Sequence, residues 1–273
     1  MALEPFMRWL NQAWRLVTTG LCFALFGLGG LVLSLVWFNL LLIVVRNKDK
    51  RRSLARRSIS ACFRCFLFIA KYTGTLNYRI EGADILKQER GCLVVANHPT
   101  LIDYVLLASV MPETDCLVKS RLLKNPFVSG VIRAADYLIN SEADTLLSES
   151  QKRLARGETL LIFPEGTRTR QGQDMVLQRG AANIAVRCQC DLRVVTIHCS
   201  EHLLDKQSHW YNVPPTKPEF TVWVKERIAV KPFTHADAQV PTRAVRQLNK
   251  HLLQKLQLVN DPFLGMNDAS ALP

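Results

Sequence analysis

The stretch Cys92-Leu-Val-Val-Ala-Asn97-His98-Pro99-Thr100-Leu-Ile-Asp103 joins an apolar run to the start of a helix. Residues 92–96 are β-prone and uniformly apolar, as in a strand buried on both faces. Residues 101–110 form an apolar run of helical length. Because His98 directly follows the strand, we expect it at the carboxyl end of a sheet, where the active sites of open α/β proteins gather.

The same alternation continues through the chain from residue 76 onward. Strands are expected at 76–79, 92–96, 115–118, 158–163, 192–198 and 220–228, and helices at 101–110, 147–156, 181–188 and 242–258. Strands separated by helices indicate an α/β domain with a mostly parallel sheet. The predicted fold class is α/β, with an N-terminal membrane-embedded helix or helical hairpin in front of that domain.

The prediction of a membrane segment comes from an uneven distribution of charge. The 273 residues include 35 Lys and Arg and 23 Asp and Glu, with 48% hydrophobic residues, a composition that excludes general disorder. Yet Leu16–Val45 is a run of 30 residues without a charged side chain. A straight helix of that length would be ~45 Å long, against a hydrocarbon core of ~30 Å. Gly27, Gly29 and Gly30 lie at its midpoint, where we expect a bend or break. Either one kinked span or a shallow hairpin fits.

A strongly basic stretch follows this run. Between Arg46 and Arg57, seven basic residues and one acidic residue give a net charge of +6, half of the +12 of the chain. The positive-inside rule therefore places the rest of the chain in the cytoplasm, at a cell inner membrane. The stretch is interpreted as the flank of the membrane segment, as a patch for anionic lipid head groups, or both. Because the excess charge is concentrated there, a nucleic-acid partner is not expected.

The predicted organisation has four parts. They are a membrane anchor with its basic flank at 1–57, an interfacial helix at 58–74, the α/β domain at 75–260 and a tail at 261–273. In the interfacial helix, Cys62 and Cys65 have no second pair at zinc spacing, and we expect them to act as small core residues. A second group, Cys188, Cys190, His198 and Cys199, would be split between strand faces, so no metal site is predicted.

His98 and Asp103 allow two interpretations. His98 is a candidate general base, and Asp103, about one helical turn away, would fix its tautomer and stabilise the imidazolium ion. Thr100 and Asp103 also form a T-x-x-D capping pattern beside Pro99. The residues alone favour neither interpretation, and Asp103 could serve in both.

A second unusual loop follows the strand expected at 158–163. Its sequence is Pro164-Glu165-Gly166-Thr167-Arg168-Thr169-Arg170. Arginine presents a planar fork that matches phosphate, and glycine lets backbone N–H groups approach an anion. Arg179, just before a helix start, could add a third contact. The alternative is an ordinary solvated turn.

Together, the segments Asn97–Asp103 and Phe163–Arg168 resemble the signature blocks of the glycerolipid acyltransferase family, whose best-known members are 1-acylglycerol-3-phosphate acyltransferases. Between them, Val118-Lys119-Ser-Arg-Leu-Leu-Lys-Asn-Pro126-Phe-Val-Ser-Gly130 is similar to a Lys…Pro-x-x-x-Gly segment of the family. The resemblance covers residues 75–235. It implies an α/β acyltransferase domain with His98 as base and Asp103 as the residue that orients it. It also implies a substrate-binding set for the acceptor: Lys119, Glu165, Gly166, Thr167, Arg168 and Arg179.

The implied reaction moves an acyl group from a thioester of CoA or acyl carrier protein to a hydroxyl of a lysophospholipid-like acceptor at a membrane. No metal or cofactor is expected. Two other functions stay open: a transacylase or thioesterase that uses the same His98 and Asp103, and a non-catalytic membrane protein that binds lipid. Labelled acyl thioester would separate them, through acyl transfer, free fatty acid, or binding without turnover.

Two positions depart from the family pattern. Asn140 stands where the second block usually ends in arginine, and Thr196 stands where the fourth block usually has proline. Both raise the question of which acceptor is used. Downstream, His198 and the segment from Trp210 to Pro215 resemble a bacterial branch associated with aryl-polyene or similar lipid pathways.

Overall fold

The computed structural model describes residues 3–140, 143–169, 173–236 and 241–257. The expected tail at 261–273 lies outside these ranges.

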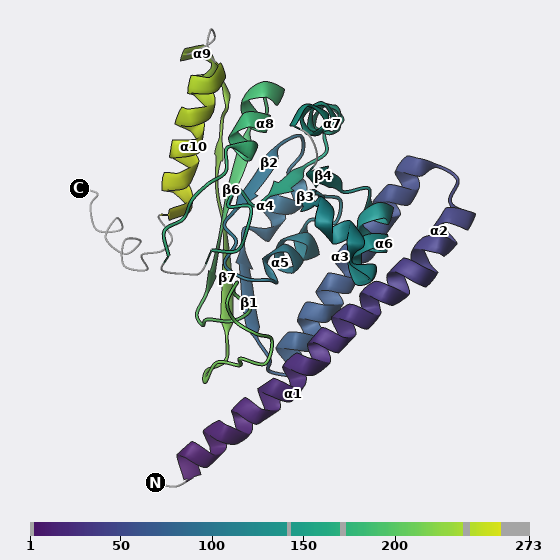
Figure 1. Cartoon of the computed structure of the whole chain (residues 1–273), viewed down its shortest axis with the longest axis vertical. Helices are drawn as coiled ribbons and strands as arrows, with labels where there is room; N and C mark the ends of the chain where they lie inside the picture. Colours follow the sequence, from purple (N-terminus) through teal and green to yellow (C-terminus); the bar gives the residue numbers. More distant parts are fainter. Residues whose placement is uncertain (1–2, 141–142, 170–172, 237–240, 258–273) are drawn as a thin grey trace, which may run out of the picture.

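A single mixed sheet forms the centre of the described chain (Figure 1). Its order is β1-β7-β6-β2-β5-β3-β4, and β6, β2, β5, β3 and β4 run parallel to one another. Strand β7 is antiparallel to β6, and β1 is parallel to β7. The mostly parallel α/β sheet expected from the sequence is thus confirmed. The strands are β1 (Asn77–Glu81), β2 (Leu93–Ala96), β3 (Asp115–Lys119), β4 (Leu138–Asn140), β5 (Leu160–Ile162), β6 (Leu192–Cys199) and β7 (Glu219–Ile228).

Helices cover both faces of this sheet (Figure 1). One face carries α7 (Ala143–Ala155), α8 (Gly180–Cys188) and α10 (Pro241–Gln257), with α9 (Lys231–Ala236) before α10. The other carries α3 (Lys48–Tyr72), α4 (Ala83–Gln88) and α5 (Asp103–Val110), with α6 (Pro126–Ala135) beside them. Leu93 and Val95 belong to the apolar core of the first face, and Val94 and Ala96 to that of the second. Both faces of β2 are buried, as a continuous apolar strand requires.

The N-terminal run forms one long helix without a break at the glycines. It comprises α1 (Leu3–Val32), a π-helical stretch at Leu33–Trp37 and α2 (Phe38–Val44). The predicted bend at the glycines was wrong: a Cβ atom on Gly30 would lie 2.7 Å from the carbonyl oxygen of Phe127, so this glycine permits close packing of α6.

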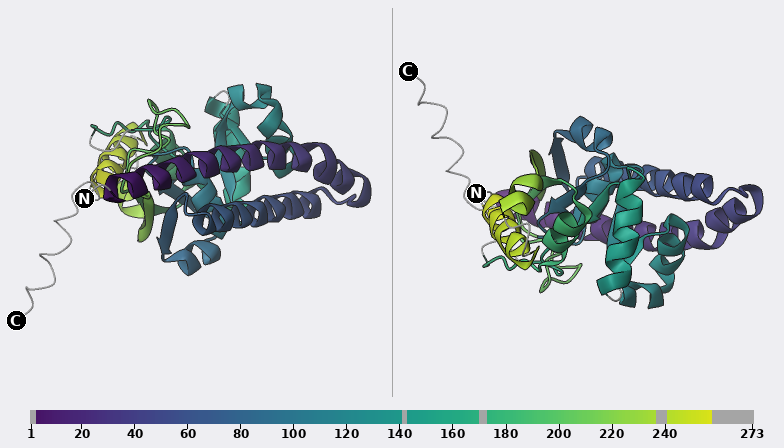
Figure 2. Two further views of the ribbon diagram at one scale, coloured as in Figure 1. Left: turned by 90° about the horizontal axis from the view of Figure 1, so that it is seen from below. Right: turned by 90° about the horizontal axis from the view of Figure 1, so that it is seen from above.

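A hairpin does form, but with a different second arm (Figures 1 and 2). The chain turns after α2 and returns as α3, one helix that crosses the predicted boundary at residues 57/58. On α3, Cys62 and Cys65 are exposed, so the expectation that they pack in the core was wrong.

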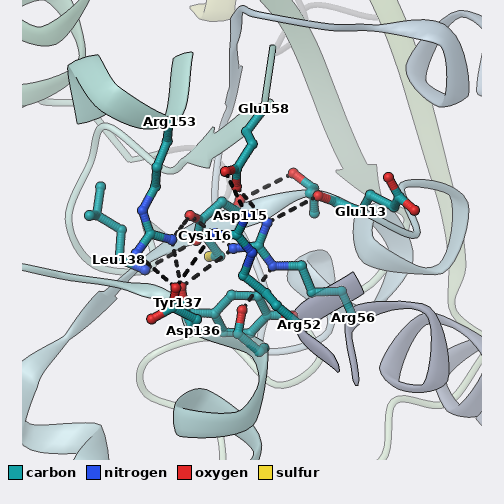
Figure 3. A network of polar contacts seen from close by, with 12 residues as sticks. Arg52, Arg56, Glu113, Asp115, Cys116, Asp136, Tyr137, Leu138, Arg153 and Glu158 are labelled. Atoms are coloured by element: carbon teal, nitrogen blue, oxygen red, sulfur yellow. Dashed lines mark hydrogen bonds and ion pairs between the residues drawn. The ribbon is translucent and has the colours of Figure 1, made fainter. Parts of the chain in front are cut away.

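Part of the basic stretch is buried in an ion-pair network with the sheet domain (Figure 3). Arg56, only 4% exposed, contacts Asp115 at 3.1 Å and Glu158 at 2.9 Å. Arg153 pairs with the same Asp115, and Arg52 contacts Glu158 at 3.1 Å. Arg56 therefore holds α3 against the start of β3, and Arg52 holds it against the segment before β5, so Arg56 is buried away from any head group.

Candidate functional site

The two loops singled out from the sequence meet at the carboxyl edge of the sheet. Strands β2 and β5 are parallel neighbours with Val95 opposite Ile162, so the residues that follow each strand lie side by side. The imidazole ring of His98 stacks on Phe163, with ring centroids 4.3 Å apart. The backbone N–H of Thr169 donates to the carbonyl of His98 at 3.0 Å, which joins the second loop to the first.

His98 and Asp103 form a direct contact. The Nδ1 atom of His98 lies 2.9 Å from Oδ2 of Asp103. The Asp103 side chain is fully buried, whereas that of His98 is 21% exposed. If Nδ1–H donates to this carboxylate, Nε2 is the atom left to accept a proton.

Asp103 also accepts hydrogen bonds from the turn that precedes α5. Its Oδ2 accepts a hydrogen bond from the backbone N–H of Thr100 at 2.7 Å, and its Oδ1 accepts one from the Thr100 hydroxyl at 2.5 Å. Burial raises the pKa of Asp103, while His98 and Thr100 oppose that shift. The start of α5 has no side-chain cap, so the capping interpretation was wrong in detail: the Asp103 carboxylate holds Thr100 in the turn before the helix and also contacts the histidine.

A second carboxyl group, that of Glu165, binds the backbone of the same loop. Glu165 is buried, and its Oε1 accepts a hydrogen bond from the backbone N–H of His98 at 2.7 Å. Burial also raises the pKa of Glu165. One oxygen of this side chain therefore holds the backbone of the histidine loop, and the substrate contact that the resemblance implied for Glu165 stays a prediction.

The remaining residues of the second loop have distinct environments. Gly166 adopts a φ of +67°, which glycine accommodates without strain, and Thr167 beside it is exposed. Arg168 donates from one guanidinium nitrogen to the carbonyls of Leu204 at 2.8 Å and Asp205 at 3.0 Å. Arg170 lies outside the described residues.

Two further predicted residues lie at the same edge of the sheet, away from His98 in the sequence. Lys119 ends β3 and stands opposite Asn140, the last residue of β4. Arg179 precedes α8 and is exposed.

The sequence interpretation missed two supports of the site. Asn97 clamps β2 to β6: its amide donates to the Ile197 carbonyl at 2.8 Å and accepts from the Ile197 N–H at 2.6 Å. The carbonyls of Leu204 and Asp205 hold Arg168. The role of Asn97 could have been suspected, because it is a polar residue at the end of an apolar strand. The role of the two backbone carbonyls could not, because any residue provides one.

Comparison with known proteins agrees with this geometry. Residues 77–200 match the family model described as Acyltransferase. A human protein named 1-acyl-sn-glycerol-3-phosphate acyltransferase beta is 28% identical over 193 residues, which cover 67% of this chain and 68% of that protein. A protein named 1-acyl-sn-glycerol-3-phosphate acyltransferase from Helicobacter pylori is 26% identical over 166 residues, covering 58% of this chain and 67% of its own. Residues 77–200 therefore form an acyltransferase domain that is similar in sequence to proteins named 1-acyl-sn-glycerol-3-phosphate acyltransferase.

The matched segment of this acyltransferase begins at β1 and ends after β6, and it contains His98, Asp103 and the second loop. The similarity in fold covers more of the chain than this segment. The crystal structure of the 1-acyl-sn-glycerophosphate (LPA) acyltransferase PlsC from Thermotoga maritima superimposes with a TM-score of 0.63 at 21% identity, covering 88% of this chain and 97% of that one. That likeness is one of fold. The acyltransferase spans about two thirds of the length of these curated relatives. No finding bears on the aryl-polyene branch, which stays a prediction.

Proposed function

We propose that this protein transfers a fatty-acyl group from an acyl thioester to a hydroxyl of a lysophospholipid-like acceptor, with His98 as general base. The observation that carries the proposal is the 2.9 Å contact between His98 and the buried Asp103 at the carboxyl edge of the sheet. The names of the curated relatives support this acceptor class.

The chemical step needs one proton carrier. Nε2 of His98 takes the proton of the acceptor hydroxyl as its oxygen attacks the thioester carbonyl. When the C–S bond then breaks, the imidazolium protonates the thiolate that leaves, which becomes the free thiol. Asp103 stabilises the imidazolium between these events, and a base placed in this way typically contributes ~10²–10⁴-fold. Atoms and charge balance without a metal or another cofactor, and the donor is a thioester of CoA or acyl carrier protein.

The anionic end of the acceptor is assigned to the second loop and its neighbours. Arg168 offers its remaining guanidinium nitrogens and Thr167 offers its backbone N–H group, while Lys119 and Arg179 add cations at the same edge. The N–H of Gly166 donates to the Phe163 carbonyl at 3.1 Å, so this glycine is assigned to shaping the turn. Glu165 is assigned to holding the His98 backbone.

Purified protein with a radiolabelled acyl thioester and lysophosphatidate in vesicles tests this function. We expect labelled diacyl product from the wild type and a loss of at least a hundredfold in His98→Ala. His251→Ala, which changes a histidine of α10 outside the site, is the matched control and should keep wild-type turnover. Labelled free fatty acid alone would indicate a thioesterase, and lipid binding without turnover would indicate a lipid-binding protein; either result refutes the proposal.

We further propose that α1 and α2 lie in the plane of a cell inner membrane, on its cytoplasmic side. The helix at Phe6–Val44 is long and apolar enough to span a membrane, yet only 11% of its most apolar 18 residues are buried inside the protein. The same helix contacts the sheet domain along its length, from Gln12, which donates to the Val213 carbonyl, to Leu41, in a cluster with Ile132. A helix that crosses the bilayer would draw this charged domain into lipid, whereas an in-plane helix leaves it in water.

Cysteine labelling at the two ends of the helix tests this placement. In a background with Cys62→Ser and Cys65→Ser, we expect Trp9→Cys and Ile43→Cys to react with an impermeant maleimide from the same side of sealed inverted membrane vesicles. Labelling of the two positions from opposite sides would show that the helix spans the bilayer.

A further inference from the structure

The connection between β6 and β7 is a long segment without helix or strand. It comprises residues 200–218, called the strap below, and lies at the end of the sheet beside α1 (Figure 1). Structureless loops longer than ~12–15 residues are uncommon in compact domains and usually serve a function. The chemistry described so far uses only two backbone carbonyls of this strap.

One side of the strap is bound to the N-terminal helix. Arg15, an arginine 2% exposed within this apolar helix, donates to the carbonyl of Pro215 at 2.6 Å and to that of Thr216. Trp210 packs on Gly20, where a Cβ atom would lie 3.4 Å from the indole ring. The strap therefore follows the surface of α1.

The other side of the strap is bound to both loops of the site. The carbonyl of Leu204 accepts a hydrogen bond from the backbone N–H of Leu101 at 3.0 Å and another from Arg168. Asp205 adds its carbonyl to Arg168, while its side chain accepts from the N–H groups of Gln207 and Ser208 at 2.8 and 2.7 Å. A continuous chain of contacts thus runs from α1 through the strap to the histidine loop and Arg168.

The tip of the strap, residues 209–211, presents aromatic rings to the outside. Trp210 is 47% exposed and Tyr211 is 53% exposed. Their rings meet edge to face at 5.7 Å, and His209 stacks on Tyr211 at 5.0 Å, so the tip is a preformed aromatic group. Tryptophan and tyrosine favour the head-group layer of a bilayer, because each has an apolar ring and a polar handle.

The surroundings of the tip favour a lipid surface over a protein partner. Val17 and Leu21 are exposed apolar residues one turn apart on α1, close in sequence to Gly20, on which Trp210 packs. Lys206 and Lys217, on either side of the tip in the strap, are exposed cations of the sign that anionic head groups attract.

We propose that the tip of the strap enters the head-group layer of a phospholipid bilayer beside α1, and that the strap thereby places Arg168 and the histidine loop at the lipid surface. This inference rests on the proposed in-plane helix and on the proposed acyl transfer.

Tryptophan fluorescence in vesicles tests the surface directly. The full chain is used with Trp9, Trp14, Trp37 and Trp223 replaced by phenylalanine, so that Trp210 is the only reporter. Vesicles contain phosphatidylglycerol and phosphatidylcholine brominated near the carbonyl end of its chains. We expect strong quenching of Trp210, and little in the matched variant that keeps only Trp223 in β7. Equal quenching of the two reporters, or a concentration-dependent shift of Trp210 emission without vesicles, would overturn the proposal, the latter in favour of a second copy of the chain.

Turnover gives a second and separate measure. For the double variant Trp210→Ser/Tyr211→Ser we expect kcat/KM for a long-chain acceptor in vesicles to fall about tenfold, with turnover of a water-soluble short-chain acceptor unchanged. Ile85→Ser, which removes an exposed apolar residue from α4, should match the wild type on both acceptors. An equal loss on both acceptors would refute the lipid contact. Failure of the acyl-transfer proposal would remove turnover from the wild type as well and leave the quenching result intact.

Discussion

The carboxylate of Asp103 joins the start of α5 to the ring of His98, with Oδ2 2.9 Å from Nδ1 of the histidine and 2.7 Å from the backbone nitrogen of Thr100. A buried acceptor shared in this way fixes the ring relative to the helix. The same carboxylate thus serves the turn before α5 and the catalytic ring, so a substitution at Asp103 should change both the stability of the protein and its kcat.

Asp103→Asn should lower kcat, because the amide no longer stabilises the imidazolium. It should also cost ~1 kcal/mol of stability, because it weakens the hydrogen bonds to Thr100 in the turn before α5. His98→Ala should lose activity by ~10²–10⁴-fold with a nearly unchanged melting temperature, since the ring is partly exposed. Thr100→Val, which removes only the hydroxyl contact to Asp103, is the control for weakening this turn without loss of the carboxylate. Near-normal turnover in folded His98→Ala and Asp103→Asn proteins would mean that His98 is not the base.

Glu165→Gln should separate a positioning role from a substrate contact. Glutamine can still accept the N–H of His98, so we expect kcat within about threefold of wild type and an unchanged pH profile; Glu165→Ala should lose far more. A large rise in KM for the acceptor in Glu165→Gln, with kcat unchanged, would show that the carboxylate binds substrate.

The same substitution should have a pH-dependent effect on stability. Because burial raises the pKa of Glu165, the folded state binds this proton more tightly than the unfolded state, and the ionised carboxylate destabilises the fold as the pH rises through the raised pKa. Glu165→Gln removes that effect. The free energy of unfolding of the variant minus that of the wild type should therefore be larger at pH 7 than at pH 4. Denaturant unfolding at the two pH values measures the difference, and a gain that grows toward acid would contradict the raised pKa.

Removing one partner from the network of Figure 3 should destabilise the protein strongly. Arg56→Met leaves Asp115 buried with one cation fewer, and breaking a buried pair in this way costs ~3–5 kcal/mol. Arg57→Met, one residue further along α3, removes an exposed pair with Glu113 and should cost under ~1 kcal/mol. Thermal unfolding compares the two, and similar melting temperatures would show that the network contributes little to stability.

What the sequence could reveal was mostly local. The apolar run of β2 and the five-residue separation of His98 and Asp103 identified the sheet edge and the histidine pair, because one strand end and one helix start determine both. The start of α6 had a local signal as well: Asn125 caps it, accepting from the N–H of Phe127, with Pro126 at its first position.

What the sequence could not reveal depends on distant partners. Arg56 is next to the exposed Arg57 in the same basic stretch, and only folding brings it against Asp115 and Glu158. The role of Glu165 depends on a backbone nitrogen 67 positions away. Gly30 likewise suggested a helix break, because its actual partner, the Phe127 carbonyl, is provided by another helix.

The last prediction concerns the choice of acceptor. Asn140 and Lys119 stand opposite each other at the ends of β4 and β3, on the edge that carries His98, and Asn140 is exposed. The resemblance to the family places arginine at this position, so the chain lacks one permanent cation and one bidentate fork there. A hydrogen bond from a charged group is worth ~1.5–3 kcal/mol, about ten- to a hundredfold in binding.

We therefore expect lysophosphatidate to be a poor acceptor for the wild type, with another hydroxyl-bearing lipid preferred. Asn140→Arg should lower the KM for lysophosphatidate by about ten- to a hundredfold. It should leave the KM for uncharged hydroxy-lipids unchanged, because only a phosphate gains from the added guanidinium group. Asn140→Gln, which lengthens the side chain without adding charge, is the matched control and should behave like the wild type. KM values measured across lysophosphatidate, other lysophospholipids and uncharged hydroxy-lipids decide the matter. Tight saturation of the wild type by lysophosphatidate, with no response to Asn140→Arg, would show that residue 140 does not select the acceptor.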